Sequence, residues 1–297
     1  MFNSLMNFTK PLDFSFKNTI YSHGWSQLLP FKIDNENKSM SYVFYDKSFS
    51  KPISTEFSTS TNDINIEFLS TNVSEAEKDQ IKEKIAHVLR LDEDLKGFYE
   101  LTKQYVEFTW MNELKVGRLL RSPTVFEDLI KTICTTNCSW ALTKNMVTNF
   151  VESLGEISSE GGKAFPTIES LANKKEKFYR DKIRAGYRSP YFVDLANSLL
   201  SGDLDPESWL TNDLPTNELK KEMKRIKGVG DYAAENLLKL VGRYDGLALD
   251  SFLRSEFYKK NNNGVKCSDK EIEKFYEKFG EYRGLAIWFD LTKRWFI

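Results

Sequence analysis

The sequence predicts an α+β protein in which a small N-terminal antiparallel β-sheet domain precedes a longer helical region. Residues 13–70 are rich in Phe, Ser, Thr and Asn, and they alternate between apolar and polar side chains most clearly at 41–45 and 62–69. That alternation is typical of strands with one buried face. From Ser74 onward, apolar residues recur at the spacing of a helix instead.

The helical region is expected to begin with a capped helix, because Ser74 followed by Glu77 has the spacing of a capping box. Loops are expected at 155–166 and 261–264. We expect a sheet domain with a connecting helix over 1–100 and a helical region over 101–297. Apolar periodicity predicts helices over 74–90, 92–109, 123–135, 139–154, 167–172, 188–200, 217–227, 231–242, 250–259, 269–278 and 282–294.

Composition bounds the class of protein. With 40% hydrophobic and 29% charged residues, the 297-residue chain is an ordinary globular one. No apolar run approaches the ~20 residues of a membrane span, and Met1–Lys10 lacks the pattern of a signal peptide. We therefore expect no membrane partner and a location in the cytoplasm or nucleoid, or in the nucleus of a eukaryote. The three cysteines suit a reducing compartment.

The stretch 217–242 has the pattern of two helices joined by a tight turn. Gly228, Val229 and Gly230 form the turn, and the glycines permit backbone angles that other residues resist. The free N–H groups at the start of the second helix favour an anion. Most nucleic-acid binders are basic, and this chain has a net charge of −1, so any attraction to a phosphate depends on the charge near the turn. The first helix supplies it with Lys220, Lys221, Lys224, Arg225 and Lys227. A tight helical turn with a solvated basic face is the alternative.

Asp250 is the candidate for chemistry. It lies eighteen residues after Tyr232 and follows the apolar run 246–249, which would lower the local dielectric constant. A carboxylate there could stabilise a cationic sugar or activate water. Asp250 also precedes an expected helix, so it could be an N-cap. The two roles are compatible.

Several motifs, in order, resemble the helix–hairpin–helix DNA glycosylase superfamily, which has a Gly/Pro-rich loop followed by a required aspartate. The segment 122–130 resembles its opening helix, 134–138 the loop that enters DNA, 185–191 a turn of the 8-oxoguanine branch, and 283–288 the last helix of the alkyladenine branch. The resemblance covers roughly residues 85–297. It implies a two-lobed helical region with a base pocket between the lobes, and double-stranded DNA carrying a damaged base as the partner. The four-cysteine cluster of the iron–sulfur branch is absent.

The resemblance also assigns roles to individual residues. Asp250 would be catalytic. Lys227 and the turn 228–230 would hold a phosphate, Asn137 would fill the gap left by the extruded base, and Tyr187 would wedge beside the orphan base. Arg188 would contact that base or a phosphate. The turn 22–25 would touch the pocket edge, with a surface or capping position as an equal alternative for His23.

Tyr232 is the most diagnostic departure from the family pattern. Bifunctional members have a lysine there, which attacks the sugar as an amine. A phenol implies a monofunctional glycosylase that uses water. Tyr232 and Trp288 would be opposing walls of the base pocket and suit a cationic alkylated base, with core packing as the alternative for both. Leu142 and Phe252 replace an arginine and a histidine of the 8-oxoguanine branch.

No cofactor is expected to be required. The main-chain carbonyls of Lys224, Ile226 and Val229 could hold a sodium or potassium ion, as hairpins of this family do. We expect a monomer. Three functions stay open: a monofunctional glycosylase for damaged, above all alkylated, purines; an oxidised-purine glycosylase of the 8-oxoguanine type; and a glycosylase-like DNA-binding protein without catalysis.

Overall fold

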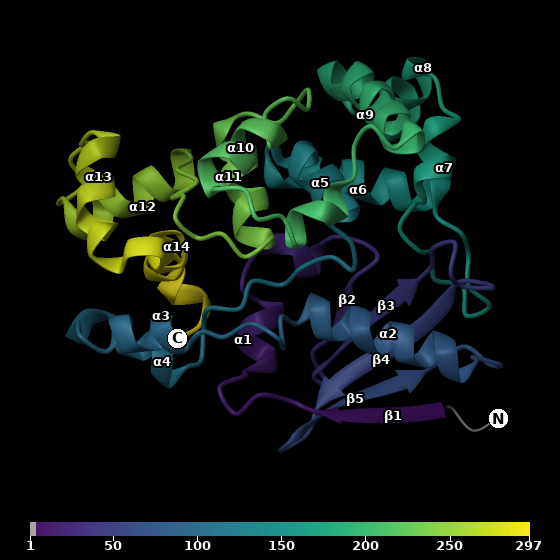
Figure 1. The fold of residues 1–297 in the computed structure, drawn as a ribbon, viewed down its shortest axis with the longest axis horizontal. Helices are drawn as coiled ribbons and strands as arrows, with labels where there is room; N and C mark the ends of the chain where they lie inside the picture. The colour runs from purple at the N-terminus through teal and green to yellow at the C-terminus, as the bar shows by residue number, and fades with distance from the viewer. Residues whose placement is uncertain (1–3) are drawn as a thin grey trace.

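The computed structural model describes residues 4–297 and contains the expected antiparallel sheet. Five strands pair in the order β1–β5–β4–β3–β2, each antiparallel to its neighbour. Figure 1 shows helix α2 (Glu75–Val88) lying along the sheet, with most of the later helices above the sheet and to its left. The strands are β1 (Ser4–Thr9), β2 (Lys32–Asp34), β3 (Ser39–Phe44), β4 (Ile53–Thr59) and β5 (Asp63–Phe68).

Alternation places one face of the sheet in the core. In β5 the side chains of Ile64, Ile66 and Phe68 are buried while their neighbours are half-buried. Helix α2 (Glu75–Val88) begins with the predicted capping box, in which Ser74 and Glu77 bond each other's main-chain N–H groups. The Ser74 N–H, together with the hydroxyls of Ser50 and Ser74, donates to the Glu77 carboxylate and lowers its pKa to about 2. The prediction missed β1 and also the short helix α1 (Phe16–Ile20), which Ser15 caps.

Most of the expected helices are present, but the one expected over 92–109 is broken. Its residues form α3 (Lys96–Thr102) and a short 3₁₀ turn over Val106–Phe108, because the backbone is extended at Tyr105, and α4 (Trp110–Glu113) begins just beyond them. Among residues 4–297, none of the helices is long and apolar enough to cross a membrane. The other helices are α3 (Lys96–Thr102), α4 (Trp110–Glu113), α5 (Val125–Thr135), α6 (Trp140–Leu154), α7 (Ile168–Ala172), α8 (Glu176–Phe178), α9 (Ser189–Ser201), α10 (Thr216–Met223), α11 (Asp231–Leu240), α12 (Ser251–Asn261), α13 (Asp269–Tyr276) and α14 (Arg283–Thr292).

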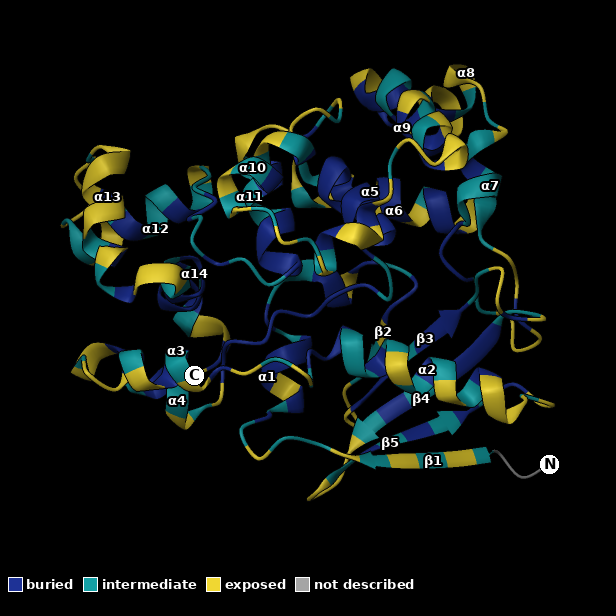
Figure 2. Cartoon of the chain, in the orientation of Figure 1, coloured by how far each residue is buried: buried dark blue, intermediate teal, exposed yellow. Residues whose placement is uncertain are grey.

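The apolar side chains form two clusters. The first joins the sheet and α2 to α5, α6, α9, α10 and α11. The second joins residues 95–119 to residues 244–296, so α3 and α4 pack with the C-terminal helices. Figure 2 shows buried residues concentrated on the sheet, on α5 and in the segment that runs between the two clusters. The hairpin helix α11 belongs to the first cluster and α12, which follows Asp250, to the second.

Arg90 connects the two clusters. Its side chain is fully buried, and its Nε donates to the carbonyl of Leu119 at 2.8 Å. Nη2 donates to Leu240 O at 2.7 Å and also to Lys239 O, which are terminal carbonyls of α11. Nη1 binds Glu93 and the hydroxyl of Tyr244. The guanidinium therefore caps α11 and fixes the 118–121 segment at the same time.

We predict that Arg90→Met lowers the free energy of unfolding by about 3–5 kcal/mol, because it removes the close ion pair with Glu93 and leaves several buried carbonyls without this donor. Denaturant unfolding of the whole chain measures this. Arg180→Met is the matched control, since Arg180 pairs with Glu176 on one exposed helix face, where such pairs contribute less than about 1 kcal/mol. Equal losses in the two variants would contradict the role given to Arg90.

Candidate active site

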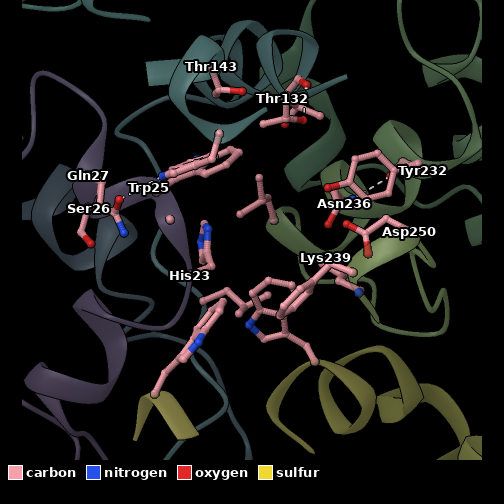
Figure 3. Close-up of a pocket in the computed structure, with 18 of the residues that line it drawn as sticks. His23, Trp25, Ser26, Gln27, Thr132, Thr143, Tyr232, Asn236, Lys239 and Asp250 are labelled. Atoms are coloured by element: carbon pink, nitrogen blue, oxygen red, sulfur yellow. Dashed lines mark hydrogen bonds between the residues drawn. The ribbon is translucent and has the colours of Figure 1, made fainter. Parts of the chain in front are cut away.

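A cavity of about 660 Å³ lies where α11, the start of α12, α14, α5 and the turn 21–27 meet. Figure 3 shows Tyr232, Asn236, Asp250 and Lys239 on one side of it, with His23, Trp25 and Gln27 opposite and Thr132 and Thr143 at a third side. Much of the wall is aromatic. The rings are those of Tyr21, Trp25, Trp140, Tyr232, Phe252, Trp288 and Trp295.

Asp250 is both an N-cap and a cavity residue. Its Oδ1 accepts the N–H of Leu253 at 2.7 Å, in the first turn of α12. The other carboxylate oxygen has no hydrogen-bond partner within residues 4–297. The cap bond fixes the orientation of the side chain, so that one oxygen stays available to a bound molecule.

The loop before Asp250 is held by side chains of α11. The amine of Lys239 donates to Leu247 O at 2.9 Å, and Glu235 accepts the N–H of Ala248 at 2.5 Å. Ala248 has a φ of 53°, a left-handed conformation that costs about 1–2 kcal/mol for a residue with a side chain. Two contacts from one helix thus hold a strained loop in the conformation that places Asp250.

Sequence spacing missed Lys239. Seven residues, or about two turns, separate it from Tyr232, so both face the same side of α11 and both line the cavity. Its side chain is 2% exposed, and burial lowers the pKa of the amine to about 8 even though Glu235 and Asp250 oppose the shift. Helical periodicity read from Tyr232 would have found it.

Tyr232 and Trp288 both line the cavity. Burial, together with the nearby Asp250 carboxylate, raises the pKa of Tyr232 to about 12. The indole N–H of Trp288 donates to Ser22 O at 2.8 Å, and its ring meets Trp295 edge to face. Trp288 therefore connects the last long helix to the turn that carries His23.

The turn 22–25 lies in the cavity wall, and His23 is the half-buried N-cap residue of the 3₁₀ turn Gly24–Gln27, although its side chain makes no cap bond. The indole N–H of Trp25 donates to the buried Asp128 at 2.7 Å, and His23 bonds Leu120 O through Nε2 at 2.7 Å. Gly24 packs against the ring of Trp140, where a Cβ atom would lie 2.4 Å from a ring carbon. Only glycine fits this approach.

The hairpin turn has the geometry that its sequence predicts. Gly228 has a φ of 92°, and α11 begins immediately after Gly230. The N–H groups of Gly230, Asp231 and Tyr232 have no partner among residues 4–297. Free N–H groups at the positive end of a helix can bind a phosphate.

The basic patch beside the hairpin is neutralised by acidic side chains. Lys224 and Lys220 reach Asp231 at 2.9 and 3.2 Å, and Lys227 reaches Asp194 at 2.7 Å. These lysines are at least partly exposed, and Lys227 is two-thirds exposed. The cationic surface expected from the sequence is therefore largely paired in the free protein.

Asn137, Tyr187 and Arg188 are brought together from two loops. Asn137 and Tyr187 are exposed, and Nδ2 of Asn137 lies 3.4 Å from the Tyr187 hydroxyl. Arg188 is 5% exposed and lies under the Tyr187 ring at 4.5 Å. Its Nε donates to Ile133 O and Thr136 Oγ1, both at 3.2 Å. In the free protein Arg188 thus supports the loop, and its contact with DNA stays a prediction.

The predicted cation ligands are main-chain carbonyls at the hairpin. Ile226 O accepts the N–H of Val229 at 3.0 Å, whereas the carbonyls of Lys224 and Val229 have no partner within the described residues. A carbonyl oxygen has two lone pairs, so all three retain one for an ion. Over the same residues, 4–297, no cluster of three or more His, Cys, Asp or Glu side chains could hold a metal.

No protein-family model and no curated protein matches this sequence, but several solved structures match the fold. An 8-oxoguanine glycosylase/lyase from Clostridium acetobutylicum, in its apo form, matches with a TM-score of 0.76 and 21% identity, over 100% of this chain and 98% of that one. The same enzyme with double-stranded DNA that has cytosine opposite 8-oxoguanine matches with a TM-score of 0.72 at 21% identity, over 99% of this chain and 98% of that one.

A 3-methyladenine DNA glycosylase from Archaeoglobus fulgidus matches with a TM-score of 0.77 and 17% identity, over 97% of this chain and 98% of that one. Enzymes for two different lesions therefore share this fold over nearly the full chain. The architecture expected from the helix–hairpin–helix motifs is confirmed as the fold of these DNA glycosylases.

We predict that Asp231→Asn strengthens binding to an undamaged DNA duplex by about three- to tenfold at low salt, because it removes a negative charge from the hairpin and frees Lys224, while Lys220 keeps its pair with Glu235. The logarithmic salt dependence of the affinity should steepen by about one. Fluorescence anisotropy over a salt series measures both. Asp79→Asn is the control, since it makes the same charge change at an exposed position on α2. Unchanged affinity would contradict a phosphate contact at the hairpin.

Proposed function

We propose that this chain is a monofunctional DNA glycosylase of base excision repair, which removes a damaged and in particular an alkylated purine. The observation that carries the proposal is the Asp250 carboxylate, with one oxygen unpaired, at an aromatic-walled cavity next to a helix–hairpin–helix turn. A volume of about 660 Å³ is ample for one purine. The fold shared with DNA glycosylases supports glycosylase activity, the coarser part of this proposal.

The damaged nucleotide must leave the base stack before its glycosidic bond can be reached. The free N–H groups after Gly230, together with Lys227, would hold a backbone phosphate near the lesion, and a sodium or potassium ion on the hairpin carbonyls would add positive charge there. Asn137 would occupy the vacated space, with Tyr187 beside the orphan base. Their contact at 3.4 Å places both at one site on the surface.

Base release breaks the N-glycosidic bond and leaves positive charge on the sugar. The Asp250 carboxylate stabilises that charge and accepts a proton from water as the water oxygen bonds to the sugar carbon. The base leaves with the bonding electron pair, and the product is an abasic site. The apolar and aromatic surroundings strengthen the attraction, because less water screens it.

Water is the proposed nucleophile because no amine occupies the hairpin position. Tyr232 stands there, and a phenol with a pKa of about 12 is protonated at neutral pH. Lys239 lines the same cavity, but its amine donates to Leu247 O. It therefore holds the loop before Asp250, and strand cleavage through a Schiff base is not expected.

The aromatic wall favours alkylated purines, which carry positive charge on the ring. The rings of Tyr232 and Trp288 would attract such a base through their electron-rich faces. An oxidised purine is the second candidate, since the C. acetobutylicum enzyme that acts on 8-oxoguanine matches over 100% of this chain. Leu142 and Phe252 oppose it, because they replace the arginine and the histidine of that branch.

Asp250→Asn should reduce base release by at least about 10²-fold while leaving duplex affinity and stability unchanged. Asparagine caps a helix as well as aspartate does, so this variant separates chemistry from capping. Single-turnover assays on duplexes with one lesion each, scored for abasic sites, measure the rate. Asp205→Asn, which alters a cap at a 3₁₀ turn, is the control. Normal excision by Asp250→Asn would overturn the role given to Asp250, whereas no excision by the native protein would leave a DNA-binding protein without catalysis.

Borohydride should trap no covalent protein–DNA adduct during turnover, because water attack forms no imine. The released product should retain an intact strand until alkali is added. Trapping followed by gel electrophoresis tests this, and Lys239→Met is the informative variant. An adduct that forms with the native protein and disappears in Lys239→Met would show that the amine of Lys239 attacks the sugar. That result would overturn the monofunctional proposal.

A further inference from the structure

We infer that His23 and Thr132 form hydrogen bonds with the base in the cavity, and that an N–H group of this base donates to Nδ1 of His23. The inference rests on the proposed glycosylase function and names the chemical class of its substrate. It depends on three features: the tautomer of His23, the hydroxyl of Thr132, and the pairing of the surrounding polar groups.

The hydrogen bond to Leu120 sets the tautomer of His23. A carbonyl oxygen only accepts, so Nε2, at 2.7 Å from Leu120 O, carries the hydrogen. Nδ1 then has a bare lone pair, and it has no partner within residues 4–297. The ring lies 4.8 Å from Trp25, in the cavity wall that faces Asp250 and Tyr232 (Figure 3).

His23 stays uncharged at neutral pH. Burial lowers the pKa of its imidazole to about 4, and the nearby positive charges of Arg90, Lys131 and Lys239 act in the same direction. A neutral ring with a bare Nδ1 can accept a hydrogen bond but cannot donate one from that atom. It also does not repel a cationic base, as an imidazolium would.

Thr132 supplies an independent sign of a missing ligand. Its side chain is 1% exposed, it lines the cavity, and its Oγ1 makes no hydrogen bond. It is the one cavity-lining atom among the buried side-chain atoms without a partner in the described chain. A buried hydroxyl without a partner costs about 1–3 kcal/mol, so a bound group that pairs with it is favoured.

Several neighbouring polar groups are already paired. The indole N–H groups of Trp25, Trp140 and Trp288 donate to Asp128, Gln27 and Ser22. Thr135 and Thr143 donate to main-chain carbonyls. The walls around His23 are thus mostly aromatic surface, and few protein groups compete for its lone pair.

The fitting substrate is a purine with an N–H group on the edge that faces His23. Hypoxanthine, 7-methylguanine and 8-oxoguanine all carry such donors. 1,N6-Ethenoadenine has a similar ring size but no N–H group, because its exocyclic ring removes both amine hydrogens. A site built around an acceptor selects against a base that cannot donate.

Nitrogen-15 NMR of the histidines tests the contact directly, since His23 and His87 are the only two in the chain. The sample is Asp250→Asn protein, labelled at histidine, with a duplex whose lesion the native protein releases, and His87→Gln assigns the signals. Free His23 should show an unprotonated Nδ1, whose resonance moves upfield when the base donates to it. An unchanged Nδ1 signal in a saturated complex would overturn the inference.

Excision kinetics test the selectivity. His23→Leu should lower kcat/KM by about tenfold for lesions with N–H groups and change it less than about twofold for ethenoadenine. His23→Gln should retain most of the activity, because its amide can donate to Leu120 and still accept from the base. Thr132→Val should lower kcat/KM by several-fold for the same lesions.

The two proposals fail in different ways. If the native protein releases none of the four lesions, the glycosylase proposal fails. Two results would overturn only the proposed hydrogen bond to His23. One is faster release of ethenoadenine than of the bases with N–H groups, and the other is an equal loss of all rates in a folded His23→Leu variant. Should His23→Leu not fold, the NMR measurement decides.

Discussion

The buried guanidinium of Arg90 is the constraint on which the cavity depends. Arginine stays charged at any physiological pH, so its burial requires a hydrogen-bond acceptor for each nitrogen of the guanidinium group. Those acceptors come from three places: Glu93 after α2, Leu119 in the following segment, and the end of α11 at Leu240. The segment at 119–120 also holds His23 through the carbonyl of Leu120. One side chain therefore sets the separation between the His23 wall and the α11 wall.

Helix α11 carries most of the proposed chemistry along its length. Its first N–H groups are free for a phosphate, and Tyr232 and Asn236 face the cavity. Glu235 and Lys239 hold the loop that ends in Asp250, and its last carbonyls bind Arg90. The residues at 232, 235, 236 and 239 lie within two turns, so helical geometry aligns them without further support. A rigid helix with both ends fixed explains how a loop with strained Ala248 can place a carboxylate reproducibly.

Local features were predictable from the sequence, and features that depend on tertiary packing were not. The capping box at Ser74, the glycine turn at 228–230 and the alternation in β5 follow from neighbouring residues alone. The break at Tyr105 was missed because it depends on α3 and α4 packing against the C-terminal helices. The burial of Arg188 was missed for the same reason, since its partners lie about fifty residues earlier. Helical spacing from Tyr232 predicts that Lys239 faces the cavity, but its bond to Leu247 O depends on a loop conformation that the spacing does not encode.

Under the proposed function, the pairing of charges at the hairpin would let a chain with a net charge of −1 bind DNA selectively. Exposed lysines that face acids at 2.7–3.2 Å attract a distant phosphate weakly, because each pair is nearly neutral beyond a Debye length of about 8 Å. A phosphate that reaches the free N–H groups of α11 competes with Asp231 for the same lysines. The lysines can then exchange Asp231 for the phosphate only where the DNA backbone also fits against the hairpin turn. In the proposed glycosylase, binding energy would thus be concentrated at the hairpin, and non-specific attraction along the duplex would stay small, so that the protein would leave undamaged DNA quickly.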